Sequence, residues 1–294
     1  MKLKEFTDLE KEFRDSVQDQ VDLKRELSVA NEKLSKYESQ LITRDWIISR
    51  DEIEIMFDNC LGDGGYGKVF RGRYRGFVVA VKTLKDFSLK DGGRDLFERE
   101  MDIASRCRHP CLLQFIGATQ EEKPLFVTEL MELSLRKLLK ERPLSEKEIV
   151  VISVDVAHAL NYLHNRKIVH RDVSSANVLL WKQNDQWRGK LGDYGTVKFL
   201  QEIMTKSPGA MIYSAPEAGS PFNQTVKIDV YSFGVLFCEM FTRKIPVFDE
   251  RKKHVDLVPN RPGREFQDLV LRCTEEDPTR RPSMETVIKK METF

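Results

Sequence analysis

Three glycines, Gly62, Gly64 and Gly67, have the spacing of a loop that closes over phosphate groups. Backbone without a side chain can approach phosphate oxygens closely and offer them N–H donors. The glycines lie between two strand patterns rather than between a strand and a helix, which argues against a dinucleotide-binding fold. A glycine-rich hairpin without a ligand is the alternative interpretation of this motif taken alone.

A lone lysine, Lys82, follows the apolar residues Val79, Ala80 and Val81, a pattern typical of a buried strand. A buried ammonium group is costly unless it meets an anion, and either a phosphate or a carboxylate would serve. Glu100, which falls in a helical pattern, is the candidate carboxylate. A solvated Glu100 is the alternative.

A polar loop between two apolar runs contains Asp172 and Asn177, and Asp193 follows a later short strand pattern. Further along, the chain adds Glu217 within Ala215-Pro216-Glu217, then Asp229 and Arg281. In order and spacing, these residues and those above resemble the protein-kinase signature set, from about residue 50 to the last residue. Within that family, the sequence is most similar to the tyrosine-kinase-like group, which includes mixed-lineage and Raf-type kinases.

The resemblance implies an α+β protein-kinase fold with a β-rich N-lobe at about 46–131 and a helical C-lobe at about 132–294. The residue patterns agree with this division. Short strand patterns occur at 53–55, 68–71 and 78–81, and two helices that are apolar nearly all round are predicted over 149–164 and 230–242.

By this resemblance, the chain would bind ATP and Mg²⁺ and transfer a phosphoryl group to protein substrates. Asp193 and Asn177 would hold Mg²⁺, and Lys82, oriented by Glu100, would grip the α- and β-phosphates. Asp172 would accept the proton of the substrate hydroxyl. Val69, Ala80 and Leu179 would enclose the adenine, the backbone of Glu129 and Met131 would bond its edge, and Thr128 matches the gatekeeper. The residues expected to bind ATP are therefore Leu61, Gly62, Gly64, Gly67, Val69, Ala80, Lys82, Thr128, Glu129, Met131 and Leu179.

Structural roles are also implied for residues outside the nucleotide site. Glu217 and Arg281 resemble a buried ion pair, and Asp229 would accept N–H groups from the loop that carries Asp172. Arg171 would leave a positive charge near the activation loop, which a phosphate could satisfy. The residues that could carry this phosphate are Thr196, Thr205, Ser207 and Tyr213.

The sequence departs from the family pattern at two positions that mark the acceptor class. Ser174 stands where serine/threonine kinases usually have a lysine, and Ala210 stands where they usually have a threonine. The arginine that tyrosine kinases supply after the catalytic aspartate is also missing, since Ser174 and Ala176 occupy its places. We expect a serine/threonine rather than a tyrosine kinase, with dual specificity left open. A pseudokinase scaffold that binds nucleotide and partners is the main alternative, and a small-molecule kinase is a third.

The first 45 residues carry a different pattern, a heptad repeat without proline or glycine. We expect one amphipathic coiled-coil helix over 1–45, joined to a kinase domain over 46–294. A single helix cannot cover its own apolar face, so a homodimer through residues 1–45 is expected, with docking onto this chain or another protein as the alternative. The a positions are Phe6, Phe13, Gln20, Leu27, Leu34 and Leu41, and the d positions are Leu9, Ser16, Leu23, Ala30 and Tyr37.

Composition excludes several classes of protein. The 48 lysines and arginines balance 47 aspartates and glutamates, so no overall charge favours nucleic acid. No apolar run is long enough for a membrane span or resembles a signal peptide. The five cysteines are odd in number and lack paired metal spacing, so they are expected to be reduced thiols in a cytoplasmic protein.

Overall fold

The computed structural model describes residues 17, 18, 20, 22–31, 33, 44–64, 67–85, 94–193, 212–219, 225–244, 255–261 and 264–294. Contacts within the chain divide it into two units, Met1–Asp45 and Trp46–Phe294. In the part of the chain that is described, no helix combines the length and the apolar character needed to cross a membrane.

The described residues between 17 and 33 in the first unit are helical and their side chains are exposed, whereas Arg44 and Asp45 at its end are not helical. Leu23 and Leu27, which are predicted heptad positions, are 68% and 61% exposed. Gln20 and Ala30 also fall in this helical part, whereas the other seven heptad positions, Phe6, Leu9, Phe13, Ser16, Leu34, Tyr37 and Leu41, lie outside the described residues. The coiled coil therefore stays a prediction.

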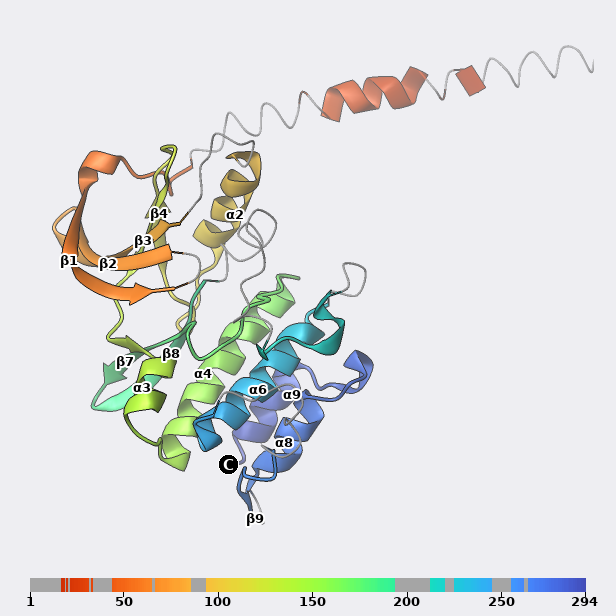
Figure 1. Ribbon diagram of the computed structural model, residues 1–294. Coiled ribbons are helices and arrows are strands. Elements are labelled where there is room, and N and C mark those ends of the chain that lie inside the picture. Colours follow the sequence, from red (N-terminus) through yellow and green to blue (C-terminus); the bar gives the residue numbers. More distant parts are fainter. Residues whose placement is uncertain are drawn as a thin grey trace, which may run out of the picture. The chain divides into compact units, whose positions relative to one another are not determined.

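The second unit begins with a five-stranded antiparallel sheet in the order β1-β2-β3-β5-β4 (Figure 1). The three predicted strands are confirmed as β1, β2 and β3. A short 3-10 helix, Arg50–Glu52, precedes the sheet. The strands are β1 Ile53–Asp63, β2 Gly67–Tyr74, β3 Phe77–Leu84, β4 Phe115–Ala118 and β5 Leu125–Glu129.

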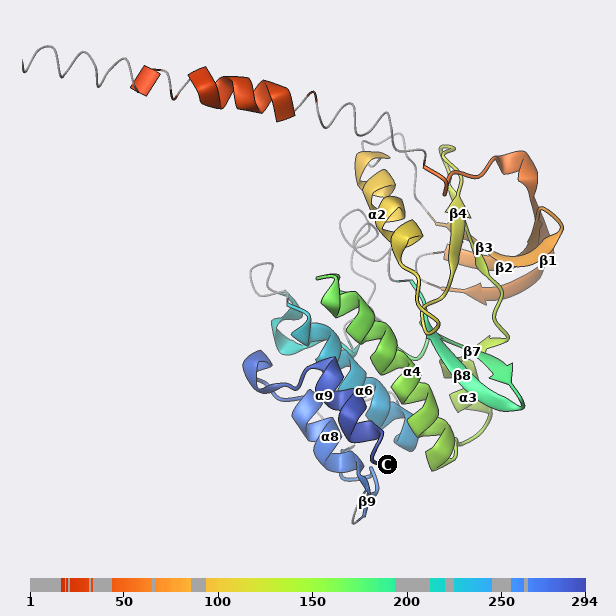
Figure 2. The same ribbon diagram turned by 180° about the vertical axis from the view of Figure 1, so that it is seen from behind.

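Helix α2, Arg94–Arg106, is the helix of this lobe in the described part of the chain. It packs beside β4, as the view from behind shows (Figure 2). Its buried residues are Phe97, Glu100, Met101 and Ala104, spaced three or four apart. This spacing places them on one side of the helix, so Glu100 is carried on the face that packs inward.

The rest of the unit is mostly helical, with a small three-stranded sheet in the order β6-β7-β8. The two predicted core helices are confirmed as α4 and α6. Its elements are β6 Leu133–Ser134, α3 Leu135–Glu141, α4 Glu146–Asn165, β7 Val178–Gln183, β8 Gln186–Leu191, η4 Pro216–Gly219, α6 Lys227–Thr242, β9 Asn260–Arg261, β10 Arg264–Glu265, α8 Phe266–Cys273, η6 Pro278–Arg280 and α9 Met284–Met291.

Local sequence explains how the two central helices form. Ser145 caps α4 by accepting a hydrogen bond from the backbone N–H of Glu148, whose side chain in turn accepts from the backbone N–H of Ser145. Every residue of α6 from Ile228 to Met240 is buried. A helix that is apolar nearly all round is stable only when other elements surround it, which places α6 at the centre of the C-lobe.

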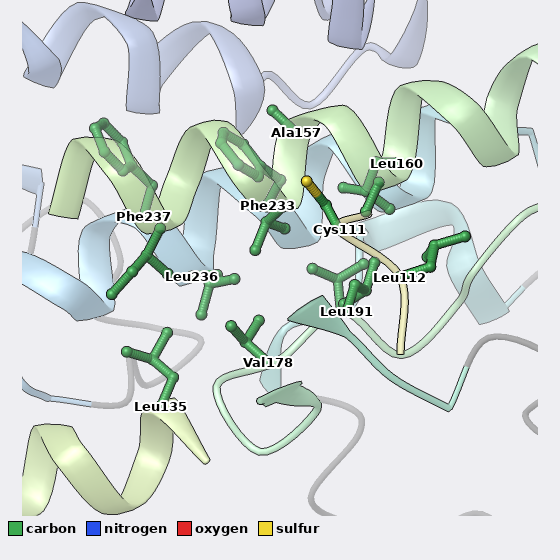
Figure 3. Close-up of a cluster of buried hydrophobic side chains, with 14 of the residues drawn as sticks. Cys111, Leu112, Leu135, Ala157, Leu160, Val178, Leu191, Phe233, Leu236 and Phe237 are labelled. Carbon is green, nitrogen blue, oxygen red and sulfur yellow. The ribbon is translucent and has the colours of Figure 1, made fainter. Parts of the chain in front are cut away.

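The core is continuous from α2 in the N-lobe to α9 in the C-lobe. Phe233, Leu236 and Phe237 of α6 belong to the same buried cluster as Ala157 and Leu160 of α4, and Val178 and Leu191 bring β7 and β8 into it (Figure 3). Phe237 also contacts Phe266 edge-on, with ring centroids 5.9 Å apart, which joins α6 to α8. The loop residues before Val178 and after Leu191 are thus fixed to a rigid base.

The cysteines provide a test of this packing. Cys60 is exposed, whereas Cys107, Cys111, Cys238 and Cys273 are buried and all five are free. Burial raises the pKa of the Cys111, Cys238 and Cys273 thiols to about 12 each. Because the thiolate is the reactive species, we expect rapid alkylation of Cys60 alone in the folded protein at pH 8, and of all five cysteines in urea.

The measurement is mass spectrometry of the intact protein after timed exposure to iodoacetamide. In Cys60→Ser the rapid phase should disappear. Rapid labelling of any buried cysteine in the folded protein would contradict the packing described here.

Candidate active site

One face of the N-lobe sheet carries four of the residues expected to bind a nucleotide. Val69 on β2 lies opposite Lys82 on β3, and Ala80 lies opposite Thr128 on β5. Residues two apart in a strand point to the same face, so Ala80 and Lys82 share a face with their partners. Ala80 is 8% exposed and Val69 is half-buried. An apolar surface beside an ammonium group suits a ligand with a flat ring and an anionic tail.

Three other expected adenine contacts come from separate elements. Leu61 is 46% exposed near the end of β1. Met131, just after β5, and Leu179 on β7 are half-buried and pack against the same core cluster. The backbone N–H of Glu129 donates to Gln114 O at 3.0 Å, so a bond from Glu129 to a purine would use its carbonyl oxygen.

The three glycines at positions 62, 64 and 67 are explained in different ways. Gly64 N–H donates to Gly67 O at 2.9 Å, which closes the hairpin between β1 and β2. A Cβ on Gly67 would lie 1.9 Å from Thr83 O, so the fold itself requires glycine there. Among the described residues, nothing lies within 4 Å of a Cβ on Gly62, and the nearest atom to one on Gly64 is 3.8 Å away. Packing thus gives no reason for those two glycines, whereas close approach of a phosphate does.

An ion pair between Lys82 and Asp193 joins the two lobes. Nζ of Lys82 lies 2.9 Å from Oδ1 and 2.8 Å from Oδ2 of Asp193. The two side chains are 15% and 32% exposed, so the pair is partly open to solvent. Glu100 is 6% exposed on α2. Because the ion pair that Lys82 forms here is with Asp193, its pairing with Glu100 stays a prediction.

The loop that carries Asp172 is tied to the strand end that carries Asp193. The His170 ring lies fully buried, with Nε2 at 2.8 Å from Gly192 O. A carbonyl can only accept, so Nε2 carries the proton, and Nδ1 accepts from Asp172 N–H at 3.2 Å. Asn177 Nδ2 donates to Asp172 O at 2.8 Å, and Gly192 N–H donates to Asn177 O at 2.8 Å. Asp172, Asn177 and Asp193 are therefore brought together by one connected set of hydrogen bonds.

The side chain of Asp229, on α6, is hydrogen-bonded to the backbone of this loop. Its Oδ2 accepts from His170 N–H and its Oδ1 from Arg171 N–H, both at 2.8 Å. His164 Nε2 lies 2.9 Å from Oδ2. The carboxylate is fully buried, so these bonds are what stabilise its charge. The predicted role of Asp229 is confirmed.

Two residues of the site have backbone angles that L-amino acids rarely adopt. Arg171 has φ of 69° and Asp193 has φ of 60°. Left-handed residues of this kind are costly and persist only where the surroundings hold them. The bonds from Asp229 and His170 supply that constraint on either side.

Asp172 itself is suited to take up a proton. Burial raises the pKa of its carboxyl group above the ordinary aspartate value, and the nearby Asp193 charge acts in the same direction, against His170 and Lys82. A raised pKa makes a carboxylate a better base, provided that it remains ionised at the working pH.

The donor atoms of the site fit a hard metal ion. Because Asn177 Nδ2 donates to Asp172 O, Oδ1 is the amide atom that can act as a ligand, and Asp193 adds a carboxylate. No cluster of three or more His, Cys, Asp or Glu suited to a metal occurs within the described ranges. A metal ion here would thus take further oxygens from nucleotide phosphates and water, which is how Mg²⁺ usually binds in such sites.

The sequence interpretation missed one ion pair beside the site. Lys190 on β8 places Nζ 2.7 and 2.8 Å from the carboxylate oxygens of Glu129, and Gln114 N–H donates to the same carboxylate at 2.6 Å. The side chain of Glu129 thus connects β5 to β8. Its partner Lys190 lies three residues before Asp193 in the chain. A charged residue between Gly189 and Leu191 in a mostly buried strand was the signal that could have revealed it.

Two further expectations about the C-lobe have different outcomes. Arg281 and Glu217 form the predicted buried pair, with Nη1 and Nη2 at 2.5 and 2.9 Å from the two carboxylate oxygens.

Tyr213 was wrongly included among the candidate phosphorylation sites. It is 2% exposed and its hydroxyl donates to Glu239 at 2.6 Å, so it is not accessible. The other candidates, Thr196, Thr205 and Ser207, and also Ala210, lie outside the described residues.

Comparison with known proteins agrees with this geometry. Residues 56–291 match the family described as the protein kinase domain, well over half of the chain, and the chain therefore belongs to the protein kinase domain family. The predicted two-lobed α+β fold and the resemblance to the tyrosine-kinase-like group are confirmed.

Several curated kinases are similar to this chain. A probable serine/threonine-protein kinase of Dictyostelium discoideum is 33% identical over 263 residues, covering 84% of this chain and 43% of its own length. Serine/threonine-protein kinase TNNI3K of Homo sapiens is 35% identical over 206 residues, covering 66% and 24%. Dual specificity protein kinase shkB of Dictyostelium discoideum is 30% identical over 270 residues, covering 83% and 41%. The chain thus spans less than half the length of each of these relatives.

The buried carboxylate of Asp229 is the contact that most directly tests this site. In Asp229→Asn, one of the two backbone N–H groups would face an NH₂ donor, and each unsatisfied buried donor costs about 1–3 kcal/mol. We expect a free energy of unfolding lower by about this amount, measured in urea, together with a distorted Asp172 loop. Asp268→Asn, at an exposed surface pair with Arg272, should change stability by less than about 0.5 kcal/mol. Equal stability of the two variants would contradict the anchoring role.

Proposed function

We propose that this chain is an ATP-dependent protein kinase that uses Mg²⁺ and transfers the γ-phosphate to serine or threonine hydroxyls of protein substrates. The observation that carries the proposal is the meeting of Lys82 from the N-lobe with Asp193 from the C-lobe, beside Asp172 and Asn177. Phosphoryl transfer depends on positioning and charge neutralisation more than on covalent chemistry, and this arrangement supplies both.

Each residue has a separate task in this proposal. Lys82 binds the α- and β-phosphates, and Asp193 and Asn177 hold Mg²⁺, which neutralises phosphate charge when it is bound. Asp172 orients the substrate hydroxyl and accepts its proton. The backbone at Gly62 and Gly64 approaches the phosphates, while Val69, Ala80 and Leu179 enclose the adenine.

The choice of serine or threonine rests on the similar proteins. Two of the relatives described above are named serine/threonine-protein kinases and one a dual specificity kinase, so dual specificity is the second candidate. Ser174 replaces the usual lysine and is 5% exposed. Losing one cation beside the transferred group could cost about 10²-fold in rate, so we expect slow turnover.

Activation by phosphorylation of the loop after Asp193 is supported by Arg171. Its Nε is buried and has no hydrogen-bond partner within the described ranges. A buried guanidinium nitrogen without a hydrogen-bond partner is costly, and a phosphate on the activation loop is an acceptor of the right kind. With Tyr213 excluded by burial, Thr196, Thr205 and Ser207 remain the candidate positions.

A pseudokinase scaffold is the alternative that Ser174 favours. It would bind nucleotide through the same residues without transferring phosphate. The intact Lys82, Asp172, Asn177 and Asp193 favour the active enzyme, since a scaffold has no need of the full set.

The deciding experiment incubates the purified protein with Mg²⁺ and ATP and locates added phosphate by intact-mass and peptide mass spectrometry. We expect phosphate on serine or threonine in the wild type, and transfer slower by about 10²-fold or more in Asp172→Asn and Asp193→Asn. Asp185→Asn, at the exposed turn between β7 and β8, is the matched control and should label normally. Absence of phosphate on the protein and on added peptides, with ATP still raising the melting temperature, would favour the scaffold.

We also propose a homodimer through the helix of residues 1–45, separate from a kinase domain over 46–294. The support is the exposure of Leu23 and Leu27, four residues apart on one helical face. Free cysteines support a reducing, cytoplasmic setting.

The dimer is tested by sedimentation. Leu27→Asp places a charge in the proposed seam and should give the mass of a monomer, while Ser28→Asp, an adjacent exposed position outside the a and d positions, should leave the mass unchanged. A monomeric wild type, or a Leu27→Asp variant that still dimerises, would overturn this proposal.

A further inference from the structure

An acidic residue stands inside the glycine loop, the part of the β1–β2 hairpin that begins at Gly62 and ends at Gly67. Asp63 lies between Gly62 and Gly64, at the end of β1, and pairs with Lys68 at the start of β2. Its side chain is 50% exposed. The loop is proposed to approach the phosphates of a nucleotide, and a carboxylate near them has a charge of the same sign. Alone, this carboxylate would oppose binding.

Two lysines balance the charge of Asp63. Nζ of Lys85, the residue that follows β3, lies 2.5 Å from Oδ1, and Nζ of Lys68 lies 3.7 Å from Oδ2. The hydrogen bond from Lys85, together with the charges of both lysines, lowers the pKa of Asp63 below the ordinary aspartate value. The carboxylate is therefore ionised at neutral pH, and the two lysines leave the group with a net positive charge. We refer to Asp63, Lys68 and Lys85 as the loop charge cluster.

Lys85 also holds the backbone of the glycine loop. Its Nζ donates to Gly64 O at 3.2 Å, and the same carbonyl accepts from Gly67 N–H at 3.4 Å. Thr83 Oγ1 donates to Lys68 O at 3.3 Å, which ties the other strand of the hairpin to the same end of β3. One ammonium group thus joins a side chain and a carbonyl of the loop to β3.

The charge of Asp63 matters for phosphate because of its distance. Adjacent Cα atoms are about 3.8 Å apart, so a phosphate bound to the backbone at Gly62 or Gly64 comes within one residue of Asp63. Charges closer together than the Debye length of about 8 Å at physiological salt are only partly screened. An unpaired carboxylate would therefore weaken phosphate binding, whereas a carboxylate accompanied by two lysines favours it.

We propose that the loop charge cluster sets the affinity of the glycine loop for phosphate, with Lys85 as a positioning residue that neutralises Asp63 and holds Gly64. The inference rests on the proposed kinase function, in which this loop covers the phosphates of ATP. Lys82 remains the proposed ligand of the α- and β-phosphates, and Lys85 acts through the loop. The cluster thus distinguishes nucleotides by charge, so it matters for ATP and not for adenosine.

Isothermal titration calorimetry with ATP and Mg²⁺, and separately with adenosine, tests the charge effect. Lys85→Met removes the closer cation from Asp63 and should weaken ATP binding about fivefold, the size expected of a partly solvated pair of charges, while adenosine binds as in the wild type. The double variant Lys85→Met with Asp63→Asn lacks both charges and should regain most of the ATP affinity.

The matched control is Lys289→Met. Lys289 forms an exposed pair with Glu285 at 2.7 Å on α9 of the C-lobe, so this variant also loses a paired lysine. It should bind ATP and adenosine as the wild type does.

Hydrogen exchange without nucleotide tests the contact with the backbone. The amides of residues 57–69 should exchange faster in Lys85→Met than in the wild type, because Gly64 O loses the donor that links the hairpin to β3. Exchange should stay fast in the double variant, in which the ATP affinity recovers. In Asp63→Asn alone the bond to Gly64 remains, and exchange should stay close to that of the wild type.

Four results would overturn the inference. Equal losses of affinity for ATP and adenosine in Lys85→Met would mean that Lys85 acts on the shape of the site and not through charge. The others are an unchanged ATP affinity in Lys85→Met, a double variant that binds ATP as weakly as Lys85→Met, and unchanged exchange of the hairpin in Lys85→Met.

These measurements do not depend on phosphoryl transfer. A wild type that binds ATP and transfers no phosphate would therefore refute the proposed kinase alone, and the binding data would still decide the role of the loop charge cluster. A wild type that binds no ATP would refute both.

Discussion

A single buried carboxylate constrains the catalytic loop. Asp229 is fully buried in the first turn of α6 and accepts hydrogen bonds from the backbone N–H groups of both His170 and Arg171. Because a buried charge is tolerable only when it is fully hydrogen-bonded, the loop backbone is held in the shape that satisfies Asp229. Arg171 is thereby kept in a left-handed conformation, and Asp172 follows it directly. The position of the proposed base is thus determined by a helix that is buried from Ile228 to Met240.

The N-lobe is built on a different principle. Its sheet offers one face to the nucleotide, with Val69 opposite Lys82 and Ala80 two residues before Lys82, and α2 packs beside the sheet through its buried residues. The lobes share the continuous core and the backbone bond from Leu113 N–H to Leu191 O, and beside the site they are also joined by pairs of charges, Lys82 with Asp193 and Lys190 with Glu129. Ion pairs that are partly solvated are weaker than packed apolar contacts and more easily exchanged for other partners, which suits lobes that must admit a nucleotide and release it.

The sequence was sufficient to predict the fold, because periodicity defines strands and helices. The specific spacing of Lys82, Asp172 and Asp193 was also sufficient to predict which side chains come together between the lobes, and their chemical roles stay predictions. It was less informative about contacts between elements distant in the chain. Lys190 with Glu129, and Trp46 with Asp102, are separated by 61 and 56 residues and leave no local pattern. The burial of Tyr213 was missed for the same reason, since a hydroxyl bonded to Glu239 looks in sequence like any exposed tyrosine.

The left-handed backbone of Asp193 has a consequence for how such a site evolves. Glycine adopts a positive φ without strain, and asparagine tolerates it about as well as aspartate, so neither replacement at this position is penalised by the fold. Its carboxylate is partly solvated and supports no core packing. Selection for stability alone would therefore let this residue drift, while Asp229, Glu217 and Arg281 would be retained. A lineage released from the demand for phosphoryl transfer could lose its chemistry in one step and keep its architecture.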